Sequence, residues 1–334
     1  MLKYGSLWHK IMNIEKELAR HTPSRPTLLT NGVFDGVHRG HQRLVGHLAA
    51  RAREKGCLAG VVTFKTHPEK VLGRRDTLPW ICTLQERVRL LRAAGADVVA
   101  PVTFTRGVAG LTARDFVLLL KKNLNMCGLV LGPDFALGRG RQGSPEYLQQ
   151  LGDELGFRVE VVKPARLDGE VISSSVIRQL LAEGYINKVN GMLGRYFSLE
   201  GRVVLGDRRG RTLGFPTANL KVQPEQAMPK DGIYATLAHI GNRVLPSVTN
   251  IGVRPTFDGL KRLIETFIFD FSEDIYRRKL TIELAARLRD EMKFKNAGEL
   301  KEQMARDVQA SRVIIGNLKP NNFIKDNDII RDSN

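Results

Sequence analysis

The sequence has few cysteines, few aromatic residues and no long apolar run. Its longest apolar stretch is residues 116–120, whereas a membrane-spanning helix needs roughly 20 apolar residues. Residues 1–24 carry scattered charges and no apolar core, so we expect no secretory signal. The cysteines Cys57, Cys82 and Cys127 are odd in number, far apart and never in a CxxC pair. They predict reduced, buried thiols in a cytoplasmic protein, and neither a disulfide framework nor a zinc site.

The composition that is present is typical of a globular protein with about two domains. The chain has 334 residues, and a typical domain has roughly 150. Hydrophobic residues make up 42% of the chain and charged residues 26%, which argues against a collagen, a coiled coil or a disordered chain. The formal net charge of +17 points to an anionic partner, either nucleic acid or small polyanions such as nucleotides. Composition alone does not decide between these partners.

The pattern of the chain changes near residue 185. Before it, short apolar runs alternate with amphipathic stretches, which predicts βαβ units and a parallel sheet. After it, short β-type runs separated by Gly, Pro, Asn and Asp predict an antiparallel barrel or sandwich. We therefore expect domains at 1–185 and 186–316 and a flexible tail at 317–334. The predicted strands are 27–30, 58–64, 97–104, 128–132, 158–162, 199–205, 232–240, 243–249, 263–271 and 279–284, and the predicted helices are 41–55, 84–94, 114–124, 144–155 and 297–309.

The densest chemical signal, GVFDGVHRGH at 32–41, lies between a predicted strand and a predicted helix. A helix start offers unpaired N–H groups and a partial positive charge, which suit a phosphate, and glycine lets phosphates approach the backbone. His38 and His41 could donate hydrogen bonds to phosphate oxygens as charge develops in a transition state. In isolation, such a motif would more often be a plain strand–turn–helix corner.

Two later segments strengthen the phosphate-binding interpretation. Asp134 and Phe135 follow another predicted strand, and Ser174, Ser175 and Arg178 open another predicted helix, where hydroxyls and a guanidinium can hold phosphates. Together the three segments resemble the HxGH nucleotidyltransferase superfamily, which transfers a nucleotidyl group from a triphosphate to a phosphate acceptor. Such a reaction depends on positioning and charge neutralisation, usually helped by Mg²⁺. A Walker A loop is excluded, because the sequence contains no Gly-Lys pair.

A second chemical centre begins in the β-rich half of the chain. A Gly/Arg-rich loop from Gly206 through Arg211 leads into Pro216, and it could fold over a polyphosphate. The Thr217 hydroxyl and the Asn219 amide that follow are hard oxygen ligands of the kind that Mg²⁺ accepts. The alternative for the loop alone is a basic surface hairpin.

Strand alternation places Glu265 on one face with Phe267, Phe269 and Phe271. A carboxylate on an aromatic face is costly to bury without a function. We therefore expect Glu265 to act as a general base for a hydroxyl. The alternative is a glutamate at a strand end that simply reaches water.

Apart from its two ends, the chain resembles the bacterial bifunctional riboflavin kinase/FMN adenylyltransferases, also called FAD synthetases. The resemblance implies an α/β Rossmann-like nucleotidyltransferase domain followed by an antiparallel six-stranded riboflavin kinase barrel with a C-terminal helix. It also implies two reactions, in which riboflavin plus ATP gives FMN, and FMN plus ATP gives FAD and pyrophosphate. The motifs that carry it stand in family order: GVFDGVHRGHQ, TFKTHP, LGPDFALGRGRQG, ISSSVIR, GRTLGFPTANL, DGIYAT, NIGVRPTF, ETFIFDF and LRDEMKF.

The resemblance assigns roles to the matching positions. It implies catalytic roles for His38, His41 and Glu265, flavin contacts for Phe135 and Arg289, and Mg²⁺ ligation by Thr217 and Asn219. The nucleotide-binding positions are Gly32, Phe34, Asp35, Gly40, Asp134, Ser174, Ser175, Arg178, Gly206, Arg211, Pro216 and Thr217.

Two positions depart from the family pattern. Thr66 stands where the family usually has proline, and Arg277 stands where it usually has glycine. A glycine at the second position would suit a positive φ, so Arg277 puts the local turn in doubt. One alternative is therefore an enzyme that retains only one of the two activities. A more remote alternative is a nucleic-acid-binding protein, but we expect neither nucleic acid nor membrane as partner, and a monomer or weak homo-oligomer.

Overall fold

The computed structural model describes residues 13–75, 77–167, 169–206, 210, 213–256 and 259–318. Over these residues the chain forms two compact units. The first runs to Ile172, and the second begins at Ser173 and also includes Pro79–Cys82. The sequence predicts a boundary at residue 185, whereas the compact units meet at Ile172 and Ser173. The assignment of one activity to residues 1–185 and the other to residues 186–316 stays a prediction. The predicted tail lies outside the described residues from position 319 onward.

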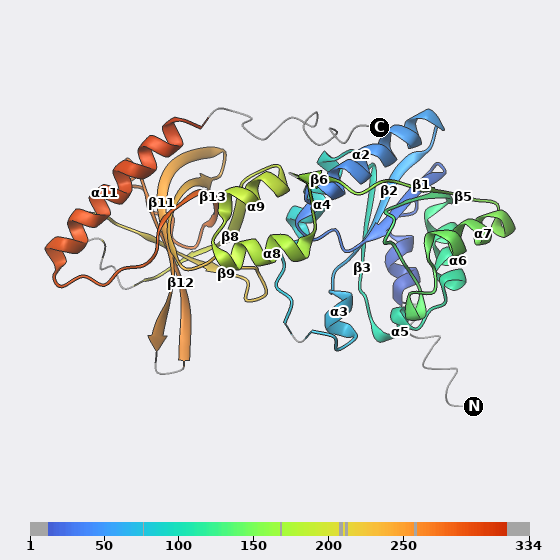
Figure 1. Cartoon of the computed structure of the whole chain (residues 1–334), viewed down its shortest axis with the longest axis horizontal. Coiled ribbons are helices and arrows are strands. Elements are labelled where there is room, and N and C mark those ends of the chain that lie inside the picture. The colour runs from blue at the N-terminus through green and yellow to red at the C-terminus, as the bar shows by residue number, and fades with distance from the viewer. Residues whose placement is uncertain are drawn as a thin grey trace. The chain divides into compact units, whose positions relative to one another are not determined.

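The first unit is a five-stranded parallel sheet with the order β3-β2-β1-β4-β5 (Figure 1). Its strands are β1 (Thr27–Gly32), β2 (Leu58–Phe64), β3 (Val98–Val102), β4 (Met126–Leu131) and β5 (Arg158–Val161). Its helices are η1 (Asp35–Val37), α2 (Arg39–Glu54), α3 (Pro68–Val71), α4 (Leu84–Ala93), α5 (Arg106–Ala109), α6 (Ala113–Leu124), η2 (Arg139–Arg141) and α7 (Pro145–Leu155). A short hairpin, β6 (Arg166–Leu167) and β7 (Glu170–Val171), follows the sheet. The predicted parallel α/β sheet is confirmed.

Two apolar cores cover the two faces of this sheet. One core packs α6 and α7 against the strands through residues such as Phe116 and Leu148. The other packs α2 and α4 against the strands through residues such as Leu48 and Leu91. Because both faces are covered, ligands have access only at the sheet edges, and in such sheets they bind beyond the carboxyl ends of the strands.

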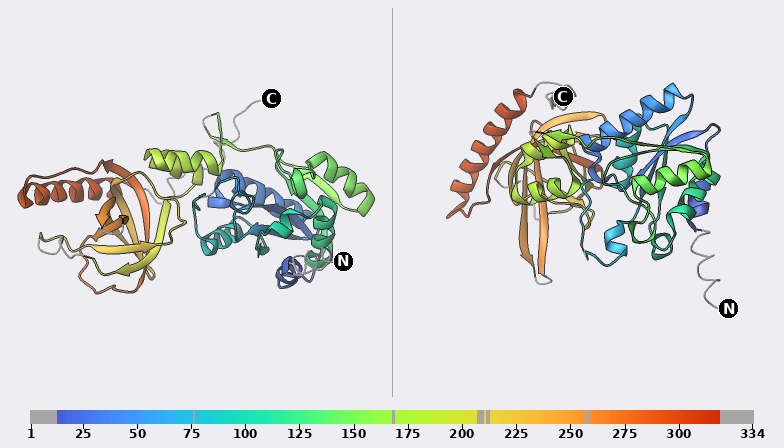
Figure 2. Two further views of the ribbon diagram at one scale, coloured as in Figure 1. Left: turned by 90° about the horizontal axis from the view of Figure 1, so that it is seen from below. Right: turned by 45° about the vertical axis from the view of Figure 1, so that its right-hand side comes forward.

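The second unit is a closed antiparallel barrel with the strand order β10-β11-β12-β9-β8-β13. Two helices, α8 (Ser174–Glu183) and α9 (Ile186–Leu193), precede it, and α11 (Ala297–Gly316) packs against β10, β11 and β13 (Figure 2). The strands are β8 (Phe197–Val204), β9 (Ala218–Val222), β10 (Gly232–Ile240), β11 (Arg243–Thr256), β12 (Gly259–Ile268) and β13 (Lys279–Arg289). The predicted six-stranded barrel with a C-terminal helix is confirmed, although the run-by-run prediction missed β9.

Four buried hydroxyl side chains lie together on one face of the barrel strands. Thr236 Oγ1 lies 2.7 Å from Ser247 Oγ and 2.8 Å from Thr249 Oγ1, which in turn lies 2.9 Å from Thr266 Oγ1. All four side chains are fully buried. Since successive strand residues point to opposite faces, the neighbours of Thr249 and Thr266 in sequence, Asn250 and Glu265, point to the other face.

The cysteines lie differently from the prediction. The Sγ atoms of Cys57 and Cys127 are 3.4 Å apart, and both residues are half-buried, while Cys82 is buried elsewhere. All three are free thiols, as expected. The prediction that all three cysteines are buried is therefore wrong for Cys57 and Cys127. In the part of the chain that is described, no helix is long and apolar enough to span a membrane.

Candidate active sites

The turn that follows β1 has an unusual backbone. Phe34, Gly36 and Val37 have positive φ angles of 52°, 74° and 39°. A positive φ is strained for any residue with a Cβ, and it is a genuine outlier for a β-branched residue such as Val37. Strain of this kind persists only where the surroundings hold the chain in place, and it is typical of functional sites.

Directly after this turn, two histidines lie at the start of α2. His38 is the N-cap residue of α2, and its Nδ1 accepts a hydrogen bond from the His41 backbone N–H at 3.4 Å. The two imidazole rings are stacked, with centroids 3.6 Å apart and planes 18° apart. His38 is only 5% exposed. Because Nδ1 is the acceptor, neutral His38 carries its proton on Nε2, which makes Nε2 a donor.

The neighbouring residues shape this site around the rings. The Phe34 ring meets the His41 ring edge-on at 5.0 Å, and Asp35 is buried. A Cβ at Gly40 would lie 3.1 Å from the His38 ring, and a Cβ at Gly32 would lie 3.1 Å from the Phe34 ring. The two glycines therefore make room for aromatic rings here, a role that the sequence analysis did not assign to them.

Asp134 and Phe135 follow β4, which is the direct neighbour of β1 in the sheet. The carboxyl ends of parallel neighbours share one edge, so both residues lie at the same edge of the sheet as the histidine turn. Asp134 is exposed, and its carbonyl accepts a hydrogen bond from Arg141 Nη2 at 3.1 Å. Phe135 packs partly against the apolar core.

The serine motif opens α8 as predicted. Ser173 is its N-cap residue and accepts a hydrogen bond from the Val176 N–H at 3.3 Å. Ser174 is half-buried, Ser175 is exposed, and Arg178 Nε donates to the Pro79 carbonyl at 2.7 Å. These residues belong to the second unit, and their role as nucleotide ligands stays a prediction.

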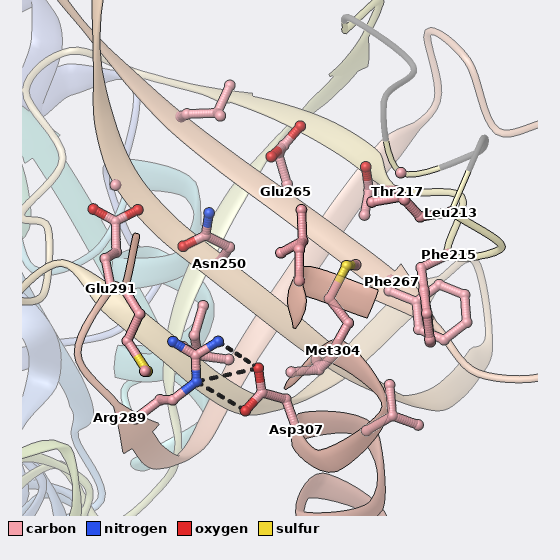
Figure 3. Close-up of a pocket in the computed structure, with 18 of the residues that line it drawn as sticks. Leu213, Phe215, Thr217, Asn250, Glu265, Phe267, Arg289, Glu291, Met304 and Asp307 are labelled. Atoms are coloured by element: carbon pink, nitrogen blue, oxygen red, sulfur yellow. Dashed lines mark hydrogen bonds and ion pairs between the residues drawn. The ribbon is translucent and has the colours of Figure 1, made fainter. Parts of the chain in front are cut away.

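The barrel unit carries a cavity of about 440 Å³ between its strands and α11. Such a volume lies in the range of small-molecule sites, ~300–1,000 Å³. Figure 3 shows that Glu265 and Thr217, two of the predicted functional residues, lie near each other, with Arg289 at the opposite side of the cavity. The lining includes Leu213, Phe215, Thr217, Asn250, Glu265, Phe267, Arg289, Glu291, Met304 and Asp307.

A row of polar side chains crosses this cavity wall. Glu265 pairs directly with Asn219 of β9 on one side and with Asn250 of β11 on the other. Directly opposite residues share a face, so the three side chains form one row. Asn250 Oδ1 is buried and has no hydrogen-bond partner among the described residues, which is costly unless water or a ligand completes its bonding. The sequence analysis quoted the motif NIGVRPTF but assigned no role to Asn250.

The expected aromatic face holds for part of its length. Glu265 and Phe267 both line the cavity, and the Phe269 ring lies 5.8 Å from the Phe267 ring. However, β12 ends at Ile268, and Asp270 has a φ of 53°. The alternation therefore stops before Phe271, whose ring lies below the Arg243 guanidinium at 5.5 Å.

Arg289 forms an ion pair with a helix residue that the sequence analysis did not identify. Its Nη2 and Nε donate to Asp307 Oδ2 and Oδ1 at 2.6 and 2.9 Å (Figure 3). Gln303 Nε2 also donates to Asp307 Oδ1 at 2.9 Å. The pair connects the end of β13 to α11 and borders the cavity. Nothing in the sequence pattern marked Asp307, because its partner is fixed only by the docking of α11.

Glu291 is a second carboxylate at the cavity. A Cβ at Gly252 would collide with its carboxylate, so the missing side chain makes room for Glu291. Burial raises the pKa of Glu291 above its usual value, and repulsion from Asp231 adds to the rise. Its neighbour Met292 is 55% exposed at the rim of the cavity.

The residues predicted to hold Mg²⁺ are suited to that ion. Thr217 lines the cavity, and Asn219 is 7% exposed beside Glu265. A Cβ at Gly206 would collide with the Asn219 amide, so this glycine shapes the donor's surroundings. No group of three or more His, Cys, Asp or Glu residues in the described residues could hold a metal. Mg²⁺ commonly keeps several waters and binds substrate phosphates beside one or two protein ligands.

The remaining positions are two residues of the predicted ATP loop and the two departures from the family pattern. Pro216 lies between Phe215 and Thr217 at the cavity wall, and Arg211 lies outside the described residues. Thr66 Oγ1 donates to the Phe104 carbonyl at 2.6 Å, a hydrogen bond that a proline side chain could not make. Arg277 has a φ of 63°. The expectation that this position adopts a positive φ is therefore confirmed, and arginine is strained there.

Comparison with known proteins covers both units. A family model described as FAD synthetase matches residues 21–176, and one described as riboflavin kinase matches residues 193–315. A crystal structure titled as a macrolide-efflux protein from Streptococcus pneumoniae is 30% identical and superposes with a TM-score of 0.82, covering 90% of this chain and 97% of that one.

Curated relatives match over nearly their whole length. The bifunctional riboflavin kinase/FMN adenylyltransferase of Escherichia coli K12 is 38% identical over 89% of this chain and 96% of its own. The protein of the same name from Bacillus subtilis is 34% identical over 88% of this chain and 94% of its own. This chain therefore belongs to the bifunctional riboflavin kinase/FMN adenylyltransferase family.

Proposed function

We propose that this protein makes FAD in two ATP-dependent steps, with riboflavin phosphorylated in the barrel unit and FMN adenylylated at the histidine turn. The observation that supports this most directly is that one chain has a carboxylate-bearing cavity in the barrel and, in the α/β unit, two stacked imidazoles at a helix start. Residues 1–185 would carry the adenylyl transfer and residues 186–316 the kinase reaction.

In the barrel cavity, Glu265 would accept the proton of the terminal ribityl hydroxyl of riboflavin. The deprotonated oxygen then attacks the γ-phosphorus of ATP, and ADP leaves. A carboxylate within reach of the hydroxyl, in a partly desolvated cavity, suits this proton transfer. Asn250 would accept a hydrogen bond from the substrate, and Arg289, held by Asp307, would form the flavin side of the site.

Thr217 and Asn219 would hold Mg²⁺ in the kinase reaction, with Gly206, Arg211 and Pro216 belonging to the loop that holds the ATP phosphates. When bound, Mg²⁺ neutralises charge on the transferred phosphoryl group and its neighbours. The two protein oxygens stand on the same wall as Glu265, so the general base and the phosphates would be held on one side of the cavity.

At the histidine turn, a phosphate oxygen of FMN would attack the α-phosphorus of ATP, and pyrophosphate would leave. His38 and His41 would donate hydrogen bonds to phosphate oxygens as negative charge builds up on them, and the first N–H groups of α2 would add a partial positive charge. No protein nucleophile is required, because the acceptor phosphate is already an anion. Gly32, Phe34, Asp35, Gly40, Asp134, Ser174, Ser175 and Arg178 are proposed nucleotide ligands, and Phe135 a proposed flavin contact.

The test is to incubate the purified protein with riboflavin, ATP and Mg²⁺ and to separate the flavins by chromatography. We expect FMN first and then FAD, and both products should disappear when EDTA is added. Accumulation of FMN without FAD, or of FAD only from supplied FMN, would mean that one of the two activities is lost. Formation of neither product would contradict the proposal. We further propose a cytoplasmic enzyme that is a monomer or weak homo-oligomer.

A further inference from the structure

The strained turn at 34–37 is held at its start by side chains of β2 and α4 and at its end by a side chain of α2. At its start, the Val33 carbonyl accepts hydrogen bonds from Thr63 Oγ1 at 2.9 Å and from Arg87 Nη1 at 3.1 Å. At its end, the Val37 carbonyl accepts a hydrogen bond from Gln42 Nε2 at 2.8 Å. The positive-φ residues therefore lie between two fixed carbonyls, directly before His38.

We propose that Arg87 is a positioning residue for adenylyl transfer: with Thr63, it fixes the Val33 carbonyl and thereby holds the turn that aims His38. This inference rests on the proposed role of the histidine turn. Arg87 would act through the backbone of the turn, so we place it outside the set of groups that contact the substrate.

The burial of Arg87 is the first argument for this role. Arg87 lies on α4 and is only 1% exposed, which makes it one of the largest fully buried side chains of the chain. Burying a guanidinium is costly, and an apolar side chain would pack α4 against the sheet at lower cost. The observed arrangement is therefore better explained by a requirement for its directed N–H donors.

The identity of its acceptors is the second argument. Arg87 Nη1 bonds to the carbonyls of Val33, which follows β1, and of Phe64, which ends β2, at 3.1 and 2.8 Å. One guanidinium thus joins the carboxyl ends of two adjacent strands, at the edge where this class of sheet binds ligands. Any shift of Arg87 would be passed directly to the residue before the positive-φ Phe34.

The strain of the turn explains why such anchors would matter. Phe34 and Val37 would relax towards negative φ if either end were released, because positive φ is unfavourable for both. That relaxation would move the N-cap of α2 and the stacked imidazoles. A displacement of about 1 Å at catalytic groups can cost roughly 100-fold in rate, so preorganisation of this turn is where Arg87 would act.

The test compares Arg87→Met, Arg87→Lys and Thr63→Val with the wild type, and measures FAD formation from FMN and ATP. We expect Arg87→Met to lower kcat roughly 10–100-fold with much smaller changes in the KM values. Arg87→Lys should restore part of the rate, because an ammonium keeps a donor without the planar fork. Thr63→Val keeps the shape of the side chain, removes one donor to the same carbonyl, and should lower kcat less than Arg87→Met.

Two controls separate positioning from folding. Riboflavin phosphorylation by the same samples should stay unchanged, since that activity is assigned to the barrel unit. Arg92→Met, an exposed arginine on the same helix, should leave both activities unchanged. If Arg87→Met does not fold, Arg87→Lys and Thr63→Val decide the question.

Wild-type kcat for FAD formation in folded Arg87→Met or Thr63→Val would overturn the inference. Equal loss of both activities, or a rise in KM without a fall in kcat, would also overturn it. A separate His38→Ala measurement tells this failure from failure of the proposed function: if His38→Ala keeps wild-type FAD formation, the histidine turn itself is not the site.

Discussion

In the turn after β1, the polar groups are placed by the backbone: positive φ angles at Phe34 and Val37 and the N-cap geometry of His38 determine where the imidazoles lie. In the barrel cavity, the polar groups are placed by the pairing of the strands, which brings Asn219, Glu265 and Asn250 opposite one another on three strands. The first site is a strained local conformation, whereas the second consists of side chains on unstrained strands.

This difference predicts how each site tolerates change. A strained turn depends on distant anchors, because its conformation is not the preferred one for its own residues. A row of side chains on a closed barrel depends on the identity of each side chain, while the barrel supplies the frame. The following experiments either separate the two sites or show that they are coupled.

The largest expected effects come from removing one chemical group at each site. His38→Ala should abolish FAD formation and spare FMN formation, while Glu265→Ala should do the reverse. Each loss should be at least roughly 100-fold, the usual range for a general base or a transition-state donor. Flavin chromatography after incubation with riboflavin and ATP measures both activities together, and loss of both activities in either variant would contradict separate sites.

A smaller effect is expected where α11 meets the barrel. Asp307→Asn keeps the shape of the side chain but leaves the half-buried Arg289 guanidinium without its charged partner. Removing one member of a buried pair costs about 3 kcal/mol, so we expect looser docking of α11 and a higher KM for riboflavin. Hydrogen exchange over α11 and kinase kinetics measure these changes. The matched control is Arg312→Ala. Arg312 is an exposed arginine that also lies on α11, and this change removes its ion pair with Asp270.

The fold was predictable because its signals are local. Alternation of apolar runs with amphipathic stretches predicted the parallel sheet, and the β runs separated by Gly, Pro, Asn and Asp predicted an antiparallel barrel or sandwich, of which the family resemblance implied the barrel. The strand β9 was missed because it is short and directly follows the Gly/Arg-rich loop, so no clear apolar run marks it. The chemical motifs were predictable for the same reason, since GVFDGVHRGH and PTAN are contiguous in sequence.

The missing parts depend on tertiary contacts. Arg87 and Thr63 donate to the Val33 carbonyl, which lies 54 and 30 positions before them in the sequence. Asp307, the partner of Arg289, lies 18 positions after it. No residue pattern reports which carbonyl a buried guanidinium will meet. The proximity of Cys57 and Cys127 was also hidden, because it depends on β1 lying between β2 and β4.

A modest stabilisation is expected at the departure from the family pattern. Arg277 has a φ of 63°, and its guanidinium lies 5.5 Å from the Tyr276 ring centroid. Arg277→Gly removes the positive-φ strain but also this contact, so we expect a net gain of about 0.5–1 kcal/mol in the free energy of unfolding. Chemical denaturation measures it. Arg277→Ala, which keeps a Cβ at positive φ, should give no gain, and an equal gain would show that the strain is not the cause.

The smallest effect concerns the amino edge of the parallel sheet, away from the histidine turn. Burial and the contact with Cys57 raise the pKa of the Cys127 thiol to about 11. The folded protein therefore keeps this proton as the pH rises above the ordinary thiol value, while the unfolded chain loses it. Stability from this group is complete below that ordinary value and is lost as the pH rises through about 11.

Alkylation of Cys127 by iodoacetamide, followed by mass spectrometry, measures this shift directly. The rate should keep rising up to a pH of about 11, because the thiolate is the nucleophile. Cys57→Ala removes the neighbouring thiol and should move the pH dependence of Cys127 to lower values, while leaving both flavin activities unchanged. An unchanged pH profile in Cys57→Ala would show that burial alone sets the pKa. A loss of FAD formation would show instead that the amino edge of the sheet is coupled to the strained turn at its carboxyl edge.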